Sequence, residues 1–326
     1  MKRFFNLSES FLTPDIHTSA KNLSALDTRQ VVLFESRMAM IHELVYSLFK
    51  NSGSSIDDIR EKYLAASPSQ IKPKDLGKHP LPAILQKHFE ALSILEKLCL
   101  CREINLTLES TDLFLEALFG KYEPCSDDAA NKIAYVKNKF TDTAYLKFAE
   151  SLGAAKFSYF TSFEMACEEV YSGKCEFCIL PIETSIDGKL FTFYSIIDKY
   201  ELKITSVCTV EHPEDQRHTT FALLRKSLLS TSIIHSASSK IRFEIRIPQS
   251  PLDISPLQSI VQAANACDLQ LCSTNSMPLT YRDNLMSHHA VFNSHGTSEL
   301  GTFLTFIALE FPQCYAVGAY YSHDKK

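Results

Sequence analysis

The residues whose types and spacing could do chemistry fall into two groups. The first group is helical. Arg37 lies in a long helical pattern. Asp57 and Glu61 stand one turn apart in a second pattern, and Ser93 and Lys97 do so in a third. An arginine can hold a carboxylate through two hydrogen bonds, and acidic side chains can accept hydrogen bonds from a ligand. The same charges could equally lie on solvated helix faces.

The second group lies at the ends of apolar runs in the middle of the chain. Glu183 and Ser185 follow the buried run in CEFCILPIETSIDG, and Thr219 and Phe221 open the run HTTFALLRK. Hydroxyl and carboxyl groups at strand ends can donate or accept protons in a reaction. Threonine also favours strands for structural reasons, so a purely structural role stays open.

Helices must position the first group. Apolar residues recur at spacings of three and four over residues 21–50, and further helices are expected near residues 56–67 and 81–102. The first helix would be about 45 Å long at the usual rise per residue. Three such helices cannot close a compact core by themselves, so we expect a partner chain to complete the bundle.

Strands must position the second group. The runs KIAYV, FSYF, FCILPI, ELKITSVCTV and TTFALLR read as strands separated by helical connections, which predicts a compact α/β domain. The remainder parses as βαββαβ, the order of a ferredoxin-like module. We therefore divide the chain into a helical domain (1–110), an α/β domain (131–228) and a ferredoxin-like domain (240–326), with linkers at 111–130 and 229–239.

Composition narrows the function classes. The chain has 326 residues, a formal charge of −5 and only 9 glycines. It has no basic excess for nucleic acid and no GxGxxG or Walker A loop. We find no membrane span or signal peptide and expect a cytoplasmic protein. The 10 cysteines lie mostly in apolar segments, so we interpret them as reduced core residues, and the pair Cys175 and Cys178 as part of a buried strand rather than a metal site.

The helical segment resembles the AroQ-type chorismate mutase domain of the bifunctional P-protein family. The family's site residues correspond here to Asp27, Arg37, Asp57, Glu61 and Ser93. Lys97 falls where the family has a residue that contacts the ether oxygen of chorismate. Two family cations are replaced by Ala20 and Leu48, with Lys21 and Lys50 nearby. The resemblance implies an all-helical bundle that clamps chorismate and stabilises charge developing on that oxygen.

The middle segment resembles the family's prephenate dehydratase domain, an α/β domain of the periplasmic-binding-protein type. CEFCILPIETSIDG is similar to its LPIENSxxG motif, with Glu183 and Ser185 matching. HTTFALLRK is similar to its TRF motif, with Thr219 at the proposed general acid and Phe221 retained. Both glycines of the family's opening loop are absent, and the segment before Thr219 is too short for the second lobe. We therefore expect one lobe and weak or absent dehydratase activity.

The C-terminal segment resembles the family's ACT domain. STNSMPLTYRDN stands at its ESRP motif and retains Ser276 and Pro278, with Asn275 replacing the Glu; ISPLQSIV, which includes Leu257, stands at the motif that meets phenylalanine. The resemblance implies that these four residues form an effector site and that the domain assists dimerisation.

Together these resemblances imply a shortened P-protein of phenylalanine biosynthesis. Chorismate mutase is the expected activity, with chorismate or prephenate as substrate and phenylalanine as a possible effector. We expect a homodimer without metal or cofactor. The alternative is a catalytically inactive paralogue that binds an aromatic metabolite or regulates a partner.

Overall fold

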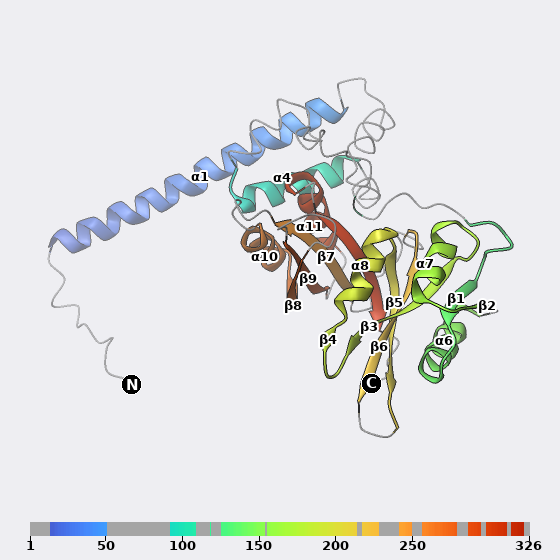
Figure 1. The fold of residues 1–326 in the computed structure, drawn as a ribbon. Helices are drawn as coiled ribbons and strands as arrows, with labels where there is room; N and C mark the ends of the chain where they lie inside the picture. The colour runs from blue at the N-terminus through green and yellow to red at the C-terminus, as the bar shows by residue number, and fades with distance from the viewer. Residues whose placement is uncertain are drawn as a thin grey trace, which may run out of the picture. The chain divides into compact units, whose positions relative to one another are not determined.

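The computed structural model describes residues 14–50, 92–108, 118, 125–153, 155–213, 217–227, 241–249, 256–278, 286–294, 298–311 and 314–322. The chain divides into two compact units, Met1–Gly53 and Ser54–Lys326. Figure 1 draws both units and labels their helices and strands except β10, which is drawn in red near the C-terminus. The expected helix at 56–67 lies outside the described residues, as do residues 229–239 and most of 111–130.

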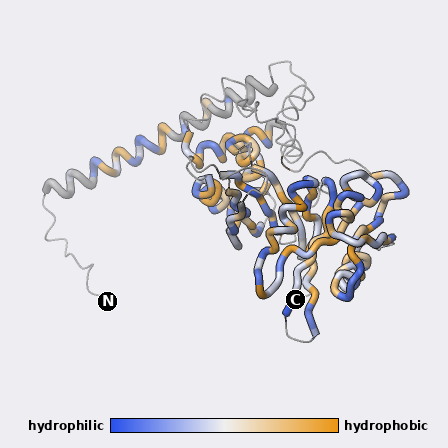
Figure 2. Tube along the Cα trace, in the orientation of Figure 1, coloured by the Kyte–Doolittle hydropathy of each residue, from blue (hydrophilic) through white to orange (hydrophobic). Residues whose placement is uncertain are grey.

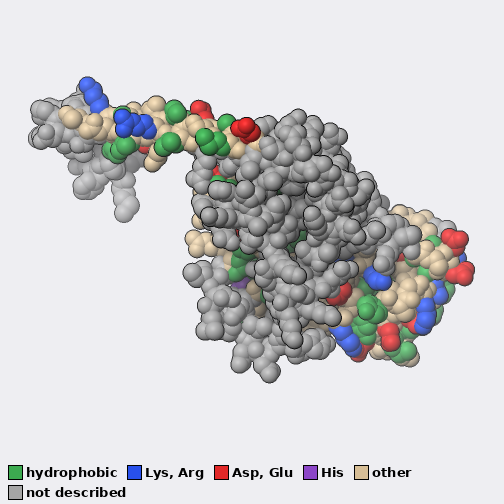
Figure 3. Space-filling view, turned by 90° about the horizontal axis from the view of Figure 1, so that it is seen from above, with side chains coloured by type: hydrophobic (Ala, Val, Ile, Leu, Met, Phe, Trp, Pro, Cys, Tyr) green, Lys and Arg blue, Asp and Glu red, His purple; other side chains and the backbone are tan. Residues whose placement is uncertain are grey.

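The first unit contains helix α1 (Pro14–Lys50). The expected helix is confirmed, but it begins seven residues earlier than residue 21, at a proline, which is well tolerated in the first turn of a helix. Leu23, Leu26 and Leu33 are each more than half exposed. Figure 3 shows hydrophobic side chains interspersed with charged ones along this helix. Whether a partner chain covers them stays a prediction.

The α/β part of the second unit has the expected elements. Strands β1 (Lys132–Val136), β2 (Lys156–Phe160) and β3 (Phe177–Thr184) are connected by helices α6 (Lys139–Leu152) and α7 (Phe163–Tyr171). The short strand β4 (Gly188–Lys189), helix α8 (Phe191–Lys199), and strands β5 (Lys203–Glu211) and β6 (His218–Arg225) follow. Strands β2, β1 and β3 are parallel, and β6 lies antiparallel between β3 and β5.

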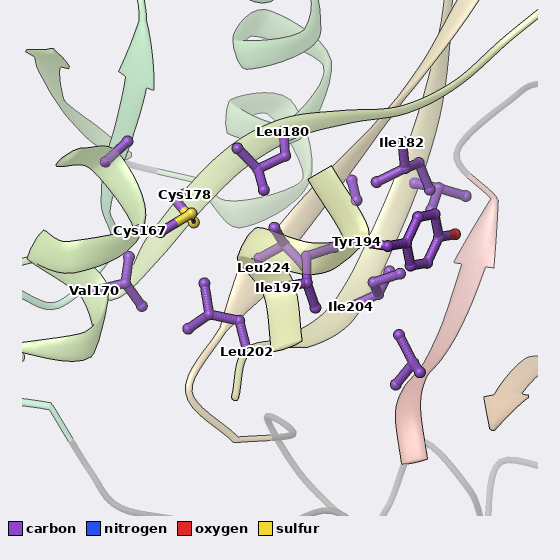
Figure 4. Close-up of a cluster of buried hydrophobic side chains, with 14 of the residues drawn as sticks. Cys167, Val170, Cys178, Leu180, Ile182, Tyr194, Ile197, Leu202, Ile204 and Leu224 are labelled. Atoms are coloured by element: carbon purple, nitrogen blue, oxygen red, sulfur yellow. Dashed lines mark hydrogen bonds between the residues drawn. The ribbon is translucent and has the colours of Figure 1, made fainter. Parts of the chain in front are cut away.

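Helices cover both faces of this sheet. Alternate residues of a strand point to opposite faces, so Phe177 and Ile179 pack in the cluster around Phe148 of α6, while Cys178 and Leu180 pack with α7 and α8. Figure 4 shows the second cluster, in which Tyr194 and Ile197 of α8 lie beside strand residues. Because β3 is buried on both faces, its sequence is a continuous apolar run.

The ferredoxin-like part has the expected βαββαβ order. It contains β7 (Ile241–Gln249), α10 (Leu257–Ala266), β8 (Leu269–Pro278), β9 (Met286–Ser294), α11 (Ser298–Glu310) and β10 (Tyr315–Ser322). Its strands are antiparallel in the order β10-β7-β9-β8. Phe303 of α11 contacts the rings of Phe243 and Phe292 on one face of this sheet.

The two parts share one sheet, which the division into separate domains does not anticipate. Strand β10 pairs in parallel with β5, and this pairing joins all ten strands. A Cβ atom at Gly318 would lie 2.5 Å from the carbonyl oxygen of Ile204, so this close approach requires glycine. Figure 2 shows hydrophobic residues running through the joined strands.

Helix α4 (Ile94–Leu108) overlaps the end of the expected third helix and continues six residues beyond residue 102. It packs against α11 and α10 of the ferredoxin-like part. Among the described helices, none combines the length and apolar character needed to cross a membrane. Seven of the ten cysteines are buried, which confirms their interpretation as mostly core residues, while their reduced state stays a prediction.

Candidate functional site

The predicted residues of the second group meet at one edge of the sheet. Strands β1 and β3 are parallel, so their carboxyl ends share this edge, and the end of β5 and the start of β6 lie there too. Thr219 lies between Thr184 of β3 and Val210 of β5 in the pairing register. The carboxyl edge of an α/β sheet is where ligands usually bind.

Thr219 is held by a histidine that the sequence motifs do not identify. Its Oγ1 lies 2.9 Å from Nε2 of His212, the residue after β5. The His212 ring stacks on Phe140 at the start of α6, with 4.0 Å between ring centroids. Its backbone N–H donates to the carbonyl of Arg217 at 2.7 Å. The hydroxyl of Thr219 therefore has a fixed proton-exchanging partner.

Glu183 and Ser185 lie on the neighbouring hairpin that β3 and β4 form, Glu183 in β3 and Ser185 in the turn. The backbone N–H of Ser185 donates to the carbonyl of His218, and the N–H of His218 donates to Oγ of Ser185, at 3.0 and 3.1 Å. These bonds attach the hairpin to β6 directly before Thr219. Glu183 is exposed. Phe221, in contrast, is 3% exposed and belongs to the hydrophobic core, so it supports the site from behind.

A hollow of about 410 Å³ opens beside His212, the partner of Thr219. It is lined by Thr209, Glu211, His212, Pro213 and His218. A larger groove along α6 shares three of these residues and also contains Lys139 and Lys147. The hollow is large enough for a small acid, and the site offers both hydrogen-bond donors and acceptors to it.

The connection between β5 and β6 lies at this edge, where the sequence predicts that a second lobe is missing. Strands β5 and β6 form a hairpin, with Glu211 opposite His218 in the register. The described residues of the connection in between are His212, Pro213 and Arg217. Among the described residues, those that line the hollow all belong to β5, β6 and the connection between them.

The start of α6 replaces the family's glycine loop with a helix cap. The Asn138 side chain accepts hydrogen bonds from the backbone N–H groups of Phe140 and Thr141, both at 3.0 Å, and Thr141 Oγ1 accepts from the Asn138 N–H. These amides are among those that a helix start otherwise offers to an anion. Asn138 occupies them, so they contribute little to ligand binding.

Only part of the predicted mutase site lies within the described residues. Asp57 and Glu61 lie outside them. Arg37 and Lys50 lie on α1, but their side chains are not described, and Lys21 is exposed on the same helix.

The two predicted residues near α4 have structural partners. Ser93 caps α4, since its hydroxyl oxygen accepts from the Glu96 backbone N–H at 3.4 Å and the Glu96 carboxylate accepts from the Ser93 N–H at 2.8 Å. Lys97 forms an ion pair with Glu310 at the end of α11. This pair attaches α4 to the ferredoxin-like part. A role for Lys97 in a reaction would require this ion pair to open.

The predicted effector residues lie on adjacent elements of the ferredoxin-like part. Asn275, Ser276 and Pro278 belong to β8, and Leu257 begins α10, which packs on β8. The Ser276 hydroxyl lies 2.8 Å from Nδ1 of His288 on β9. Binding of phenylalanine there stays a prediction.

A buried polar cluster on the other face of this sheet is absent from the sequence-based predictions. Glu244 of β7 is fully buried and pairs with Lys189 of β4. The hydroxyls of Tyr194 and Tyr320 donate to its other oxygen at 3.4 and 3.3 Å, and Nδ1 of His289 lies 3.4 Å away. Burial would raise the pKa of Glu244, but the charge of Lys189 and the bonds from His289 outweigh it and lower the pKa to about 2.

Comparisons with known proteins support the predicted α/β domain of the prephenate dehydratase type. Residues 136–280 match the family model for prephenate dehydratase. No curated protein matches the chain. The match begins at the end of β1 and extends to the end of β8. It therefore includes every residue of the candidate site.

Several solved structures are similar at low identity. The prephenate dehydratase from Streptococcus mutans is 19% identical, with a TM-score of 0.49, over 59% of this chain and 99% of that one. The prephenate dehydratase from Arthrobacter aurescens in complex with L-Phe is 14% identical, with a TM-score of 0.45, over 60% of this chain and 91% of that one. GqqA, described as a quorum-quenching acylase, is also 14% identical, with a TM-score of 0.44, over 59% of this chain and 95% of that one.

Proposed function

We propose that the α/β part binds prephenate at the edge formed by β3, β5 and β6 and dehydrates it as a prephenate dehydratase. The observation that carries this proposal is the 2.9 Å contact between Thr219 Oγ1 and His212 Nε2 beside the 410 Å³ hollow. The pair lies inside the region that matches the dehydratase family model. The resemblance of HTTFALLRK to the TRF motif of that family implies the role of general acid for Thr219.

The proposed reaction needs a proton donor and no cofactor. The bond between the ring carbon and its hydroxyl breaks as the ring carboxylate leaves as carbon dioxide, and the electrons of the broken carbon–carbon bond enter the ring. The hydroxyl leaves as water after taking the Thr219 proton, which His212 replaces. A positioned general acid of this kind accelerates such a step by a factor of about 10²–10⁴.

The predicted lack of an opposing lobe limits how well this site can work. A closed site excludes water and strengthens each polar interaction with the substrate. The described lining of the hollow comes from β5, β6 and their connection alone, and the amides at the start of α6 are occupied by Asn138. We therefore propose weak substrate binding and slow turnover, with a high KM for prephenate.

The test measures phenylpyruvate formed from prephenate by the full chain. Thr219→Val removes the hydroxyl at nearly constant volume and is expected to reduce kcat about a hundredfold. Thr219→Ser keeps the hydroxyl and should retain activity. Thr205→Val is the matched control, because Thr205 is a buried threonine on β5 whose hydroxyl donates to the Leu223 carbonyl at 3.0 Å, outside the hollow. Equal activity in the Thr219→Val and Thr205→Val variants would refute the role of Thr219.

A second candidate function is favoured by the predicted lack of an opposing lobe. A domain that binds an aromatic acid without converting it needs no enclosure, so the chain could act as a metabolite-binding regulatory partner. Prephenate binding by calorimetry without phenylpyruvate formation would support this function over the dehydratase. The expected mutase activity, phenylalanine effector, homodimer and cytoplasmic location rest on the sequence, and chorismate consumption that is lost in Arg37→Ala would test the mutase.

A further inference from the structure

The buried acid Glu244 lies where the ferredoxin-like part meets the α/β part. It belongs to β7, whereas its partner Lys189 belongs to β4 and Tyr194 to α8. Glu244 and His289 are fully buried, and Tyr194 and Tyr320 are 1% and 4% exposed. The cluster is inaccessible to a substrate, so its role lies in what it holds in place.

Charge pairing determines where Lys189 can lie. A buried carboxylate that loses its cation is strongly disfavoured, because neither water nor another charge compensates it. The Lys189 ammonium also lies 4.8 Å from the centre of the Tyr194 ring, which adds a cation–π contact. Glu244 therefore restricts the position of Lys189, and with it the strand that carries this lysine.

Lys189 lies in β4, the second strand of the hairpin that carries Glu183 and Ser185 of the candidate site. It stands opposite Glu183 in the pairing of β3 with β4, and Gly188 stands opposite Thr184. The turn in between is closed by hydrogen bonds between Thr184 and Asp187. Ser185, inside the turn, bonds to the backbone of His218 next to Thr219. Three short steps thus connect Glu244 with the residues around Thr219.

We propose that Glu244 is a positioning residue that acts through Lys189 to fix the hairpin of residues 183–189 against β6. It thereby sets the positions of Glu183 and Ser185 in the candidate site. That these two residues serve a site rests on the proposed function. Glu244 and Lys189 thus connect the ferredoxin-like part directly to the site. A rearrangement of β7 therefore changes how firmly the hairpin is held against β6.

Hydrogen exchange of the backbone amides tests the proposal without any ligand. In Glu244→Gln, the amides of residues 183–189 are expected to exchange about tenfold faster or more, including the Ser185 amide that bonds to His218. Asp198→Asn is the matched control. It breaks the 2.5 Å ion pair between Asp198 of α8 and Arg246 of β7, which connects the same two parts without involving the hairpin. This control should leave exchange at residues 183–189 unchanged.

A second variant covers the case in which Glu244→Gln does not fold. Lys189→Met combined with Glu244→Gln removes both charges, and replacing both partners of a buried pair is tolerated far better than removing one. Its hairpin should still exchange faster, because the anchor is gone. Unchanged exchange at residues 183–189 in a folded variant would overturn the proposal. An equal increase in Asp198→Asn, or a uniform increase along the chain, would do the same.

The result is separable from the dehydratase proposal. If the wild-type chain forms no phenylpyruvate, the dehydratase proposal fails while the exchange measurement still decides the role of Glu244. If the wild-type chain is active, Glu244→Gln should lower kcat/KM for prephenate and Asp198→Asn should not. Unchanged kcat/KM in a Glu244→Gln variant with a loosened hairpin would show that the hairpin does not position the site.

Discussion

Replacing Gly318 by alanine should weaken the junction between β10 and β5. A Cβ atom at this position would meet the carbonyl oxygen of Ile204 at 2.5 Å and its Cβ atom at 2.7 Å, and real Cβ atoms essentially never approach closer than 3.0 Å. Both contacts are with atoms that a side-chain rotation cannot move. The two strands must therefore separate by about half an ångström, in a sheet whose interior is close-packed.

The cost of this separation can be estimated. Overpacking a close-packed interior typically costs about 1–3 kcal/mol, and we expect about 3 kcal/mol here because the backbone must shift. That is a change of more than a hundredfold in the unfolding equilibrium constant. For a urea slope of about 3 kcal/mol/M, the unfolding midpoint should fall by about 1 M with the slope unchanged. Urea unfolding followed by circular dichroism measures both quantities.

Two further variants make the reasoning refutable. Gly173→Ala places a Cβ in open space, at a φ of +75°, so its cost is conformational and should be about 1–2 kcal/mol. Ile204→Ala leaves the carbonyl oxygen and the Cβ atom in place, so it should not rescue Gly318→Ala in the double variant. A loss below that of Gly173→Ala, or rescue by Ile204→Ala, would contradict a clash with the backbone.

Two more perturbations test the elements that support the site. Asn138→Ala removes the cap of α6 and should cost about 1 kcal/mol in urea unfolding; an unchanged midpoint would show that water replaces the cap. The pKa of Glu244 is lowered from 4.5 to about 2, so its contribution to stability is present above pH 4.5 and is lost as the pH falls toward 2. The free energy of unfolding should fall by up to about 3 kcal/mol over this range. If this free energy falls just as steeply with pH in Glu244→Gln, Glu244 is not the cause.

The sequence predicts the elements of the second unit better than it predicts their contacts. FCILPIET reads as a buried strand because its apolar run is continuous, and the alternation in IRFEIRIP places Glu244 and Arg246 on one face. Alternation does not tell whether that face meets water or another layer. Here the layer is α8, and Glu244 is buried beneath it.

Only part of the candidate site could be predicted from the sequence. Motif similarity locates Thr219, Ser185 and Glu183, since these residues lie within short strings beside strands that resemble the motifs of a known family. His212 carries no such signal, because its contact with Thr219 depends on how the hairpin closes and on the ring of Phe140 from another element. Lys97 illustrates the opposite case: its spacing suggests a reaction, while its partner Glu310 comes from a helix more than two hundred residues away in the chain.

The pairing of β10 with β5 also bears on how the protein is made. During synthesis, β5 pairs with β6 early, but its other edge stays unpaired until residues 315–322 have been added. An unpaired apolar strand edge can pair with another chain, and contacts that are distant in sequence form slowly. The nascent α/β part therefore passes through a period in which it is prone to aggregation, and this period ends when β10 completes the sheet.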